Sequence, residues 1–216
     1  MTEPTPAPGE SDPPIGLDLV APEVYAPMLR RLSLAAIGVG VGAALLAAVW
    51  VSWPIAVLIG LVVGAPTVGY ALALRRRRMW LRGNTIHART LFGERRIPLA
   101  EATGVEILVY PGRLSRIVLR VTAGPDTQII PLAMYTDAGS GRELHLLGLR
   151  KLADGLAASQ LATAVAVSDM LVHQLRAEAR DAGLGERPLY RAVTLVRAKD
   201  YVSPVVLTDS EVAELS

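Results

Sequence analysis

Cysteine is absent from this chain of 216 residues. Its absence excludes disulfide frameworks, thiolate metal sites and cysteine nucleophiles. Charge is also scarce, because Asp, Glu, Lys and Arg make up 19% of the residues, against about 25% in ordinary soluble domains. The scarcity is local: no charged residue lies between Arg31 and Arg75, a gap of 43 residues. A soluble core of this size cannot bury so long an apolar stretch, so the composition indicates a membrane protein.

Residues 1–29 contain seven prolines and five acidic residues but no Lys or Arg. Proline interrupts both helices and strands, and a charged segment with little apolar surface does not fold alone, so we expect a disordered acidic tail. The acidic start and the late apolar run are unlike a secretory signal peptide. A Pro-rich ligand for a partner is the alternative use of this segment.

The uncharged stretch is long enough for two membrane crossings, since one helical crossing takes about 20 residues. The break lies at Pro54, because proline suits the first turn of a helix and disfavours helix in the residue before it. We therefore predict a transmembrane helical hairpin over residues 30–78, with helices at 32–51 and 54–74.

Basic residues flank the open end of the predicted hairpin. Arg30 and Arg31 precede the first helix, and a run of four arginines, residues 75–78, follows the second. Trp50 and Trp53 lie at the opposite end, where indole rings favour the headgroup layer. Positive charge stays on the cytoplasmic side of a membrane, so we expect a multi-pass protein of the inner (plasma) membrane with both termini in the cytoplasm.

Small residues recur in both predicted helices at the spacing that lets helices approach closely. Gly38 and Gly42 form one GxxxG pattern, and Gly60 and Gly64 form another. Folding the hairpin at Trp53 brings Gly42 and Gly64 to similar depth, so we expect these glycines to pack the two helices together. Docking onto another membrane protein is the alternative. No Asp, Glu, Lys, Arg or His lies in either helix, which argues against a proton or ion path.

Beyond Arg82 the chain changes to short segments rich in β-branched residues, separated by turn residues such as Gly93, Pro111 and Gly124. Five strands are predicted, at residues 84–90, 94–98, 104–110, 116–122 and 127–131. In the fourth of these, polar and apolar positions alternate only partly, which is typical of a strand that packs on a core. The spacing predicts an antiparallel sheet or a small barrel on the cytoplasmic side.

A Leu-rich helix predicted at 143–158 follows the strands and is expected to cap them, so that residues 79–158 form one domain. An additional helix is predicted within 159–185. The fold class is therefore α+β: a two-helix transmembrane hairpin, then a small antiparallel β domain capped by C-terminal helices.

The C-terminal tail, residues 186–216, has weaker signals. A strand is predicted at 192–197. Thr208 and Glu211 have capping-box spacing, which predicts a short terminal helix. The tail serves either as a docking peptide or as a loosely packed edge element.

The order of two membrane helices, an arginine run, strands and a Leu-rich helix resembles the bacterial pleckstrin-homology-like (PH-like) membrane proteins of actinobacterial type. Residues 81–99 are similar to the opening hairpin of that family, in which a strand and a turn lead to a second strand that ends in Ile-Pro-Leu. An E-x-x-x-V pattern follows, here Glu101 to Val105, and Ile130-Pro131-Leu132 recurs where such domains close their sheet.

The resemblance covers about residues 80–158. It implies an open barrel capped by one helix, in a module that binds proteins or lipids and performs no catalysis. Small accessory membrane subunits of this general size also occur in actinobacterial respiratory complexes. The helix within 159–185 and the tail after it depart from the family pattern.

Residue types that carry catalysis or bind metals are few and scattered. His87, His145 and His173 lie far apart in sequence, with no partner at metal-ligand spacing. Ser140 lies between two glycines but lacks the outer residues of a nucleophile elbow. Asp137 and Glu143 are the nearest approach to a carboxylate pair. We therefore expect no enzyme activity, no cofactor and no metal.

The strongest chemical feature is positive charge next to the predicted membrane helices, because residues 75–120 hold eleven arginines against three glutamates. Eight arginines are the candidate residues for binding lipid or a partner: Arg75, Arg76, Arg77, Arg78, Arg82, Arg89, Arg95 and Arg96. A plain topology anchor is the simplest role for the run after the second helix, and recognition of anionic headgroups is the functional one. Aromatic residues are only 5% and no recognition motif accompanies the charge, which argues against nucleic acid.

These observations lead to one hypothesis with two alternatives. The protein is expected to be noncatalytic, with a cytoplasmic module that docks a protein partner as an accessory subunit or scaffold of a larger membrane complex. The first alternative is a reader of anionic lipid at the inner leaflet. The second is a subunit of a membrane enzyme or exporter whose active site lies on another chain.

Overall fold

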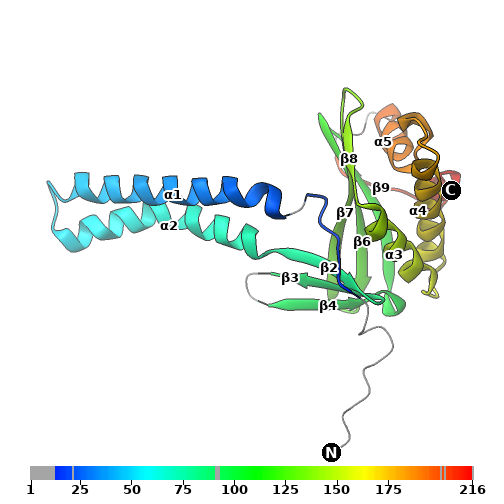
Figure 1. Cartoon of the computed structure of the whole chain (residues 1–216), viewed down its shortest axis with the longest axis horizontal. Coiled ribbons are helices and arrows are strands. Elements are labelled where there is room, and N and C mark those ends of the chain that lie inside the picture. The colour runs from blue at the N-terminus through cyan, green and yellow to red at the C-terminus, as the bar shows by residue number, and fades with distance from the viewer. Residues whose placement is uncertain (1–12, 21, 91–92, 200, 202, 216) are drawn as a thin grey trace, which may run out of the picture. The chain divides into compact units, whose positions relative to one another are not determined.

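The computed structural model describes residues 13–20, 22–90, 93–199, 201 and 203–215 (Figure 1). The chain divides into two compact units. The hairpin unit comprises residues 20–78 and 89–93, and the remaining residues form what we call the α+β module. Each unit is described by itself below.

Two long apolar helices form the hairpin unit: α1, Pro22–Ala47, and α2, Trp53–Arg76. By length and composition, Val24–Ala47 and Trp53–Leu74 could each span a membrane. Ser52 is the N-cap of α2 and Pro54 lies in its first turn, as the break at this proline predicts. Trp50 and Trp53, at the turn, are 90% and 75% exposed.

The first helix begins and ends earlier than the predicted 32–51, so part of the segment predicted to be disordered, residues 1–29, is helical. Pro22 lies in the first turn of α1, where a missing N–H costs nothing, and Pro27 removes only one intrahelical hydrogen bond. Ile15–Gly16 forms strand β1, and the next residue, Leu17, is fully buried. The prediction of disorder is therefore wrong from residue 15 to 20 and from 22 to 29, and residues 1–12 lie outside the described part.

The two helices meet at glycines, but only two of the four predicted ones take part. A Cβ added at Gly60 would lie 2.6 Å from the carbonyl oxygen of Gly40, and one added at Gly64 would lie 3.1 Å from that of Ala36. Gly38 and Gly42 have nothing within 4 Å of an added Cβ, so their predicted packing against the second helix is wrong. Residues two apart on a helix point to opposite sides, and Gly40 occupies the side that faces α2.

The α+β module contains two antiparallel sheets. The smaller has the order β1-β2-β3-β4. Its longer strands are β2, Arg78–Arg82, β3, Thr85–Arg89, and β4, Glu94–Pro98. In this sheet Ile15 of β1 pairs with Leu81, so a strand that precedes both long helices closes the edge. The sequence pattern predicted β3 and β4 but not β2, which begins inside the arginine run.

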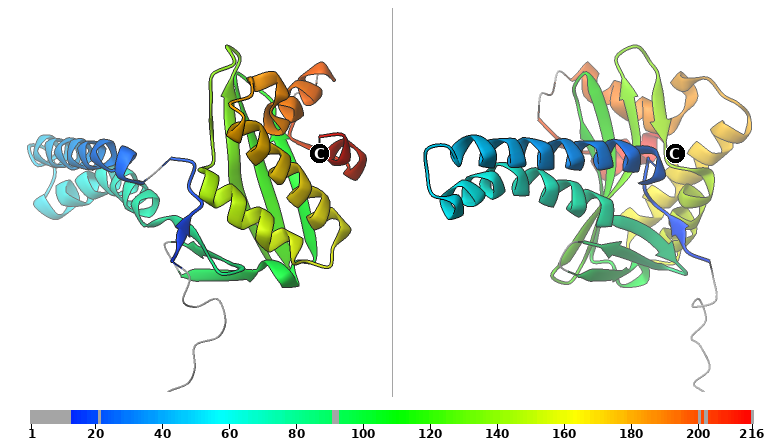
Figure 2. Two further views of the ribbon diagram at one scale, coloured as in Figure 1. Left: turned by 45° about the vertical axis from the view of Figure 1, so that its right-hand side comes forward. Right: turned by 60° about the vertical axis from the view of Figure 1, so that its left-hand side comes forward.

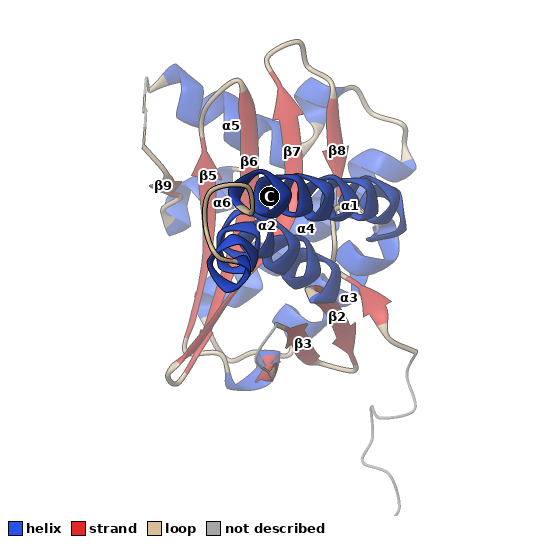
Figure 3. Cartoon of the chain, turned by 90° about the vertical axis from the view of Figure 1, so that its left-hand side faces the viewer, coloured by secondary structure: helices blue, strands red, loops and turns tan. Residues whose placement is uncertain are grey.

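The larger sheet has five strands in the order β8-β7-β6-β5-β9, seen side by side in Figure 3. Its strands are β5, Gly104–Tyr110, β6, Leu114–Ala123, β7, Asp126–Thr136, β8, Gly141–Glu143, and β9, Val205–Val206. The register of β6 and β7 shifts at Val118, which pairs with Pro131, while Ile117 pairs with Ala133. The bulge leaves Leu132 as the extra residue of β7, and it allows Pro131, which has no N–H to donate, to lie inside the strand.

Helices cover one face of the larger sheet. They are α3, Leu146–Ala157, α4, Ala162–Ala179, and α5, Pro188–Ala198 (Figure 2). Leu149, Leu152 and Leu156 of α3 are fully buried in a core shared with Ile107 and Leu119 of the sheet. The two sheets are separate and do not close into one barrel, so the α+β class is confirmed in its coarse form only.

The C-terminal region differs from the sequence prediction in one element. Residues 192–197 lie in the helix α5 and not in a strand, because Leu189, Ala192, Val193 and Val196 repeat at helical spacing and are all buried. The short helix α6, Asp209–Glu214, is present, and Thr208 and Glu211 form the predicted capping box. Two 3-10 turns, Leu99–Glu101 and Leu184–Glu186, complete the module.

Candidate functional site

Arg76 at the end of α2 and the next two residues, Arg77 and Arg78, are exposed, and the side chain of Arg75 lies outside the described part. The backbone N–H of Arg77 donates to Ala73 O and ends the helix. Positive charge near the C-terminus of a helix also interacts favourably with its dipole, which gives this run a structural role beside any membrane role. Arg82 on β2 and Arg89 on β3 are exposed as well.

Two of the predicted lipid-binding arginines have acidic partners instead. Arg96 Nε donates to Glu94 Oε1 at 3.2 Å, and Arg95 Nε lies 3.9 Å from Asp126 Oδ1. The pKa of Glu94 is lowered, first by its hydrogen bond with His87 and then by Arg96. Local pairing therefore accounts for Arg95 and Arg96 without a bound headgroup.

The larger sheet has a second, unusual surface, which we call the outer face: the side of its five strands that points away from the helices. Leu108 and Val118 pair across it and are only 6% and 7% exposed, yet neither belongs to the core on the helical side. Leu114, Ile129 and Val206 are 42–49% exposed. The apolar members of the outer face, taken from the register, are Leu108, Leu114, Val118, Ile129, Pro131, Met134 and Val206.

Three charged residues of the outer face have contacts within the face, and Arg142 of β8, opposite Met134, is exposed. Glu106 pairs with Arg120 across β5 and β6, and both Nε and Nη2 of the arginine donate to Oε2 of the glutamate. The guanidinium of Arg116 lies 5.4 Å from the centre of the Tyr110 ring, a cation–π contact. An antiparallel sheet with one covered face ordinarily has a polar second face, so this surface is apolar for its position.

A buried polar cluster joins the sheet to the helices on the other side. Glu143 of β8 accepts hydrogen bonds from Tyr135 Oη at 2.5 Å, Gln174 Nε2 at 2.8 Å and Arg187 Nη1 at 3.0 Å. Gln174 in turn accepts from the backbone N–H of Leu189, which fixes the start of α5. The cluster uses every polar contact to hold elements together, so we interpret it as structural.

Tyr135 should keep its proton to a far higher pH than an unfolded tyrosine does. Burial raises its pKa most, and the hydrogen bond and charge of Glu143 raise it further. An unfolded tyrosine ionises near pH 10, so the stabilising contribution of the folded, protonated Tyr135 is complete below pH ~10 and falls as the pH rises above that value. Absorbance at 295 nm checks this: the unmodified protein should show a late tyrosine component that ionises well above pH ~10, and the Tyr135→Phe variant should lack it. An unchanged late component would contradict it.

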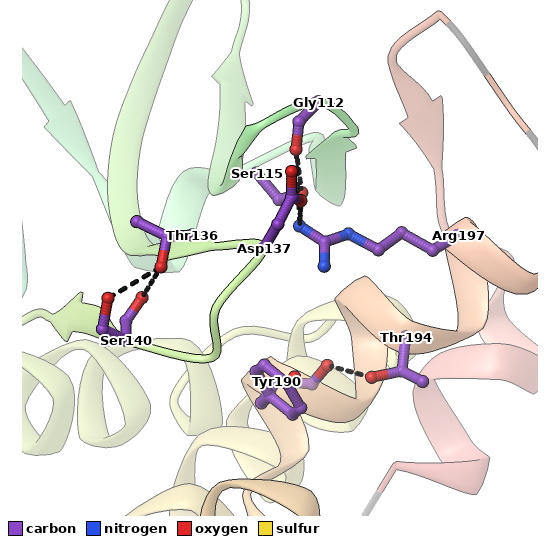
Figure 4. Close-up of polar contacts among 8 residues, drawn as sticks. All are labelled: Gly112, Ser115, Thr136, Asp137, Ser140, Tyr190, Thr194 and Arg197. Carbon is purple, nitrogen blue, oxygen red and sulfur yellow. Dashed lines mark hydrogen bonds and ion pairs between the residues drawn. The ribbon is translucent and has the colours of Figure 1, made fainter.

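A second polar contact fastens α5 to two turns of the sheet (Figure 4). Arg197 Nη2 donates to Asp137 Oδ1 at 2.8 Å, to Ser115 Oγ at 2.9 Å and to Gly112 O at 3.3 Å. Ser115 is fully buried and itself donates to Gly112 O. The arginine therefore ties the β5–β6 turn to the segment after β7.

The residues considered for catalysis from the sequence are not brought together. Asp137 pairs with Arg197, while Glu143 lies in the buried cluster. His87 stacks on Trp80 in the smaller sheet, and His145 is the N-cap of α3. Ser140 exchanges hydrogen bonds with Thr136 in the β7–β8 turn (Figure 4). Among the described residues, no group of three or more His, Asp or Glu side chains could hold a metal ion.

Sequence reasoning missed the outer face, although a signal was present. Ile117, Val118 and Leu119 are consecutive apolar residues in one strand, and consecutive residues point to opposite faces. Partial alternation in β6 therefore meant two apolar faces, one on the core and one outside.

No family model, no curated protein and no solved structure matches this chain.

Proposed function

We propose that this protein is a noncatalytic membrane protein whose α+β module docks a protein partner through the outer face of the larger sheet. In this proposal α1 and α2 span the inner membrane, both termini are cytoplasmic, and the protein acts as an accessory subunit or scaffold of a larger membrane complex. The exposed apolar outer face is the observation that carries the proposal.

The composition of the outer face supports a protein partner. Tyrosine, methionine and arginine are enriched at the centres of protein interfaces, and Tyr110, Met134, Arg116 and Arg120 lie among the aliphatic side chains of this surface. Apolar side chains exposed on an uncovered sheet face are available to a partner. Leu114, Ile129 and Val206, which surround the nearly buried Leu108 and Val118, would lose exposed apolar area on docking.

The outer face carries both signs of charge, as the polar parts of a protein interface do. Glu106 neutralises Arg120, whereas Arg116 stacks on the neutral Tyr110 ring and keeps its charge. Arg116 and Arg142 therefore offer cations to acidic groups of a protein partner. The lipid-reading alternative is supported by a different observation, the exposure of the arginines at residues 76–78, where α2 ends.

The membrane topology and the family resemblance remain part of the proposal. Two apolar helices with basic residues at one end support a hairpin with that end in the cytoplasm. Antiparallel strands in two sheets followed by the helix α3 support the PH-like resemblance of the module.

Introducing an acidic residue on the outer face should remove the partner. Ile129→Asp places a charge that must be desolvated in the interface, so we expect the amount of co-purified partner to fall at least tenfold after detergent extraction from native membranes. The matched control is Val165→Asp on α4, because Val165 is 41% exposed and Ile129 is 42% exposed. A photo-crosslinking amino acid at position 129 then identifies the molecule that touches this face.

Three results would count against protein docking on the outer face. The first is equal recovery of the same proteins with both variants. The second is a crosslink at position 129 to lipid alone, which would favour the lipid-reading alternative. The third is equal loss with both variants, which would point to general damage to the module.

A further inference from the structure

A cavity of about 540 Å³ opens on the α+β module where the last turns of α4 meet the start of α5. Its volume is in the ordinary range for small-molecule sites. The residues that line it are His173, Arg176, Ala177, Ala179, Arg180, Glu186, Pro188, Arg191 and Leu215. None of them takes part in the outer face or in the buried cluster around Glu143.

Positive charge dominates this cavity. Arg176, Arg180 and Arg191 face a single acidic residue, Glu186, so the lining has a formal charge of +2. Within the described part of the chain, the side chains of Arg176 and Arg180 have no hydrogen bond or ion pair. Among the described residues, the Arg191 guanidinium contacts a neutral acceptor, the backbone oxygen of Glu214 at 3.2 Å.

The helix dipoles do not explain all three arginines. Arg176 lies in the last turn of α4, where a cation is favourable. Arg191, however, is the fourth residue of α5, close to the positive end of that helix. The first turn of α5 has no acidic residue, and its N-cap makes no side-chain hydrogen bond. An anion in the cavity would supply a negative charge close to the start of α5 and an ionic partner for the arginines.

A neighbouring histidine adds a further polar group without a partner. His173 lies one turn before Arg176 on α4, and Arg180 lies one turn after it, so the histidine and the two arginines share one side of that helix. Nδ1 of His173 is buried and has no hydrogen-bond partner among the described residues. Because this atom is closed off from water, it does not face the cavity, and His173 contributes only the rest of its ring to the lining.

We propose that this cavity binds a phosphoryl group, held by the guanidinium groups of Arg176, Arg180 and Arg191. Guanidinium forks match phosphate oxygens in pairs, and a phosphate ester carries nearly two negative charges at pH 7, which balances the lining. The phosphoryl group belongs either to a soluble metabolite or to a lipid headgroup. The site is independent of partner docking on the outer face.

The test uses the full-length protein in nanodiscs of phosphatidylcholine, titrated calorimetrically with inorganic pyrophosphate. We expect saturable binding that weakens at least tenfold in Arg176→Gln/Arg180→Gln. The control is Arg142→Gln/Arg150→Gln, which removes the same charge from exposed positions elsewhere in the module and should bind as the unmodified protein does. Arg176→Lys keeps the charge but loses the guanidinium group that can donate two hydrogen bonds in parallel. Its affinity for pyrophosphate should lie between those of the unmodified protein and the Arg176→Gln/Arg180→Gln variant.

A second arm distinguishes the two sources of the phosphoryl group. Nanodiscs that contain a phosphatidylinositol phosphate should weaken pyrophosphate binding if a lipid headgroup occupies the cavity, and should leave it unchanged if the ligand is soluble. Absence of pyrophosphate binding by the unmodified protein in phosphatidylcholine discs would overturn the proposal. Equal weakening in both double variants would also overturn it, because the effect would then be one of net charge.

Discussion

Replacing Glu143 with alanine is expected to lower the free energy of unfolding of the α+β module by about 3–5 kcal/mol, the usual cost of removing one partner of a buried ion pair. The side chain of Glu143 is 9% exposed and that of its partner Arg187 is 20% exposed. Its loss also leaves Tyr135 Oη and Gln174 Nε2 without acceptors. Unpaired donors in a buried site keep their full desolvation cost.

A small compensation accompanies the loss of Glu143. The pKa of Glu178 is raised, first by burial and then by the charge of Glu143, so removing that charge eases the repulsion between the two carboxylates. Only one unfavourable interaction is relieved, against three hydrogen bonds lost from Glu143. The net effect therefore remains strongly destabilising.

Hydrogen exchange of the full-length protein in detergent measures the effect, through the slowest amides of β6 and β7. The matched control is Glu106→Ala, which also removes a glutamate from an ion pair with arginine. Because the side chains of Glu106 and Arg120 are 43% and 35% exposed, the control should cost no more than about 1 kcal/mol. Equal losses of protection in the two variants would show that the buried Glu143 ion pair stabilises the module no more than the exposed Glu106 ion pair does.

The parts of the fold that the sequence predicts well are those encoded by local patterns. An uncharged run of 43 residues and a proline at its middle are sufficient to predict two long apolar helices. The capping box at Thr208 is equally local, since both of its members lie within one helical turn. Short β-branched runs between turn residues predict β3, β5 and β6 for the same reason.

Features that depend on long-range pairing were missed. Strand β1 forms only because Ile15 meets Leu81, and two residues beside prolines carry no strand signal of their own. Residues 192–197 contain β-branched side chains, but burial against the sheet and α4 selects a helix there. Tertiary contacts override weak local preferences in both cases.

The candidate sites show the same limit. Arg95 and Arg96 appear as part of a cationic cluster in the sequence, whereas the fold brings Asp126 and Glu94 beside them. Arg176 and Arg180, with ordinary i, i+4 spacing on a helix, became notable only when α5 placed Arg191 across a cavity from them. Charge counts along the chain do not reveal which cations have partners in space.

Replacing Gly60 with leucine is expected to separate the two helices of the hairpin unit. Even a Cβ at this position would lie 2.6 Å from Gly40 O and 2.8 Å from the Cβ of Ala44, and the first of these is backbone that cannot move aside. Within a membrane, no hydrophobic drive holds two helices together, so they depend on close packing at small residues. A few ångströms of separation therefore remove most of the association.

Spin labels report this separation, because the chain has no cysteine of its own. Labels at Ile37→Cys and Val68→Cys, which line one groove of about 430 Å³ between the helices, should show strong dipolar coupling that Gly60→Leu abolishes. Gly38→Leu is the matched control, since an added Cβ there has nothing within 4 Å. Coupling that survives Gly60→Leu but disappears in Gly38→Leu would mean that the helices pack through the GxxxG face of Gly38 and Gly42. Loss of a partner without loss of coupling in Gly38→Leu would instead assign that face to contact with another membrane protein.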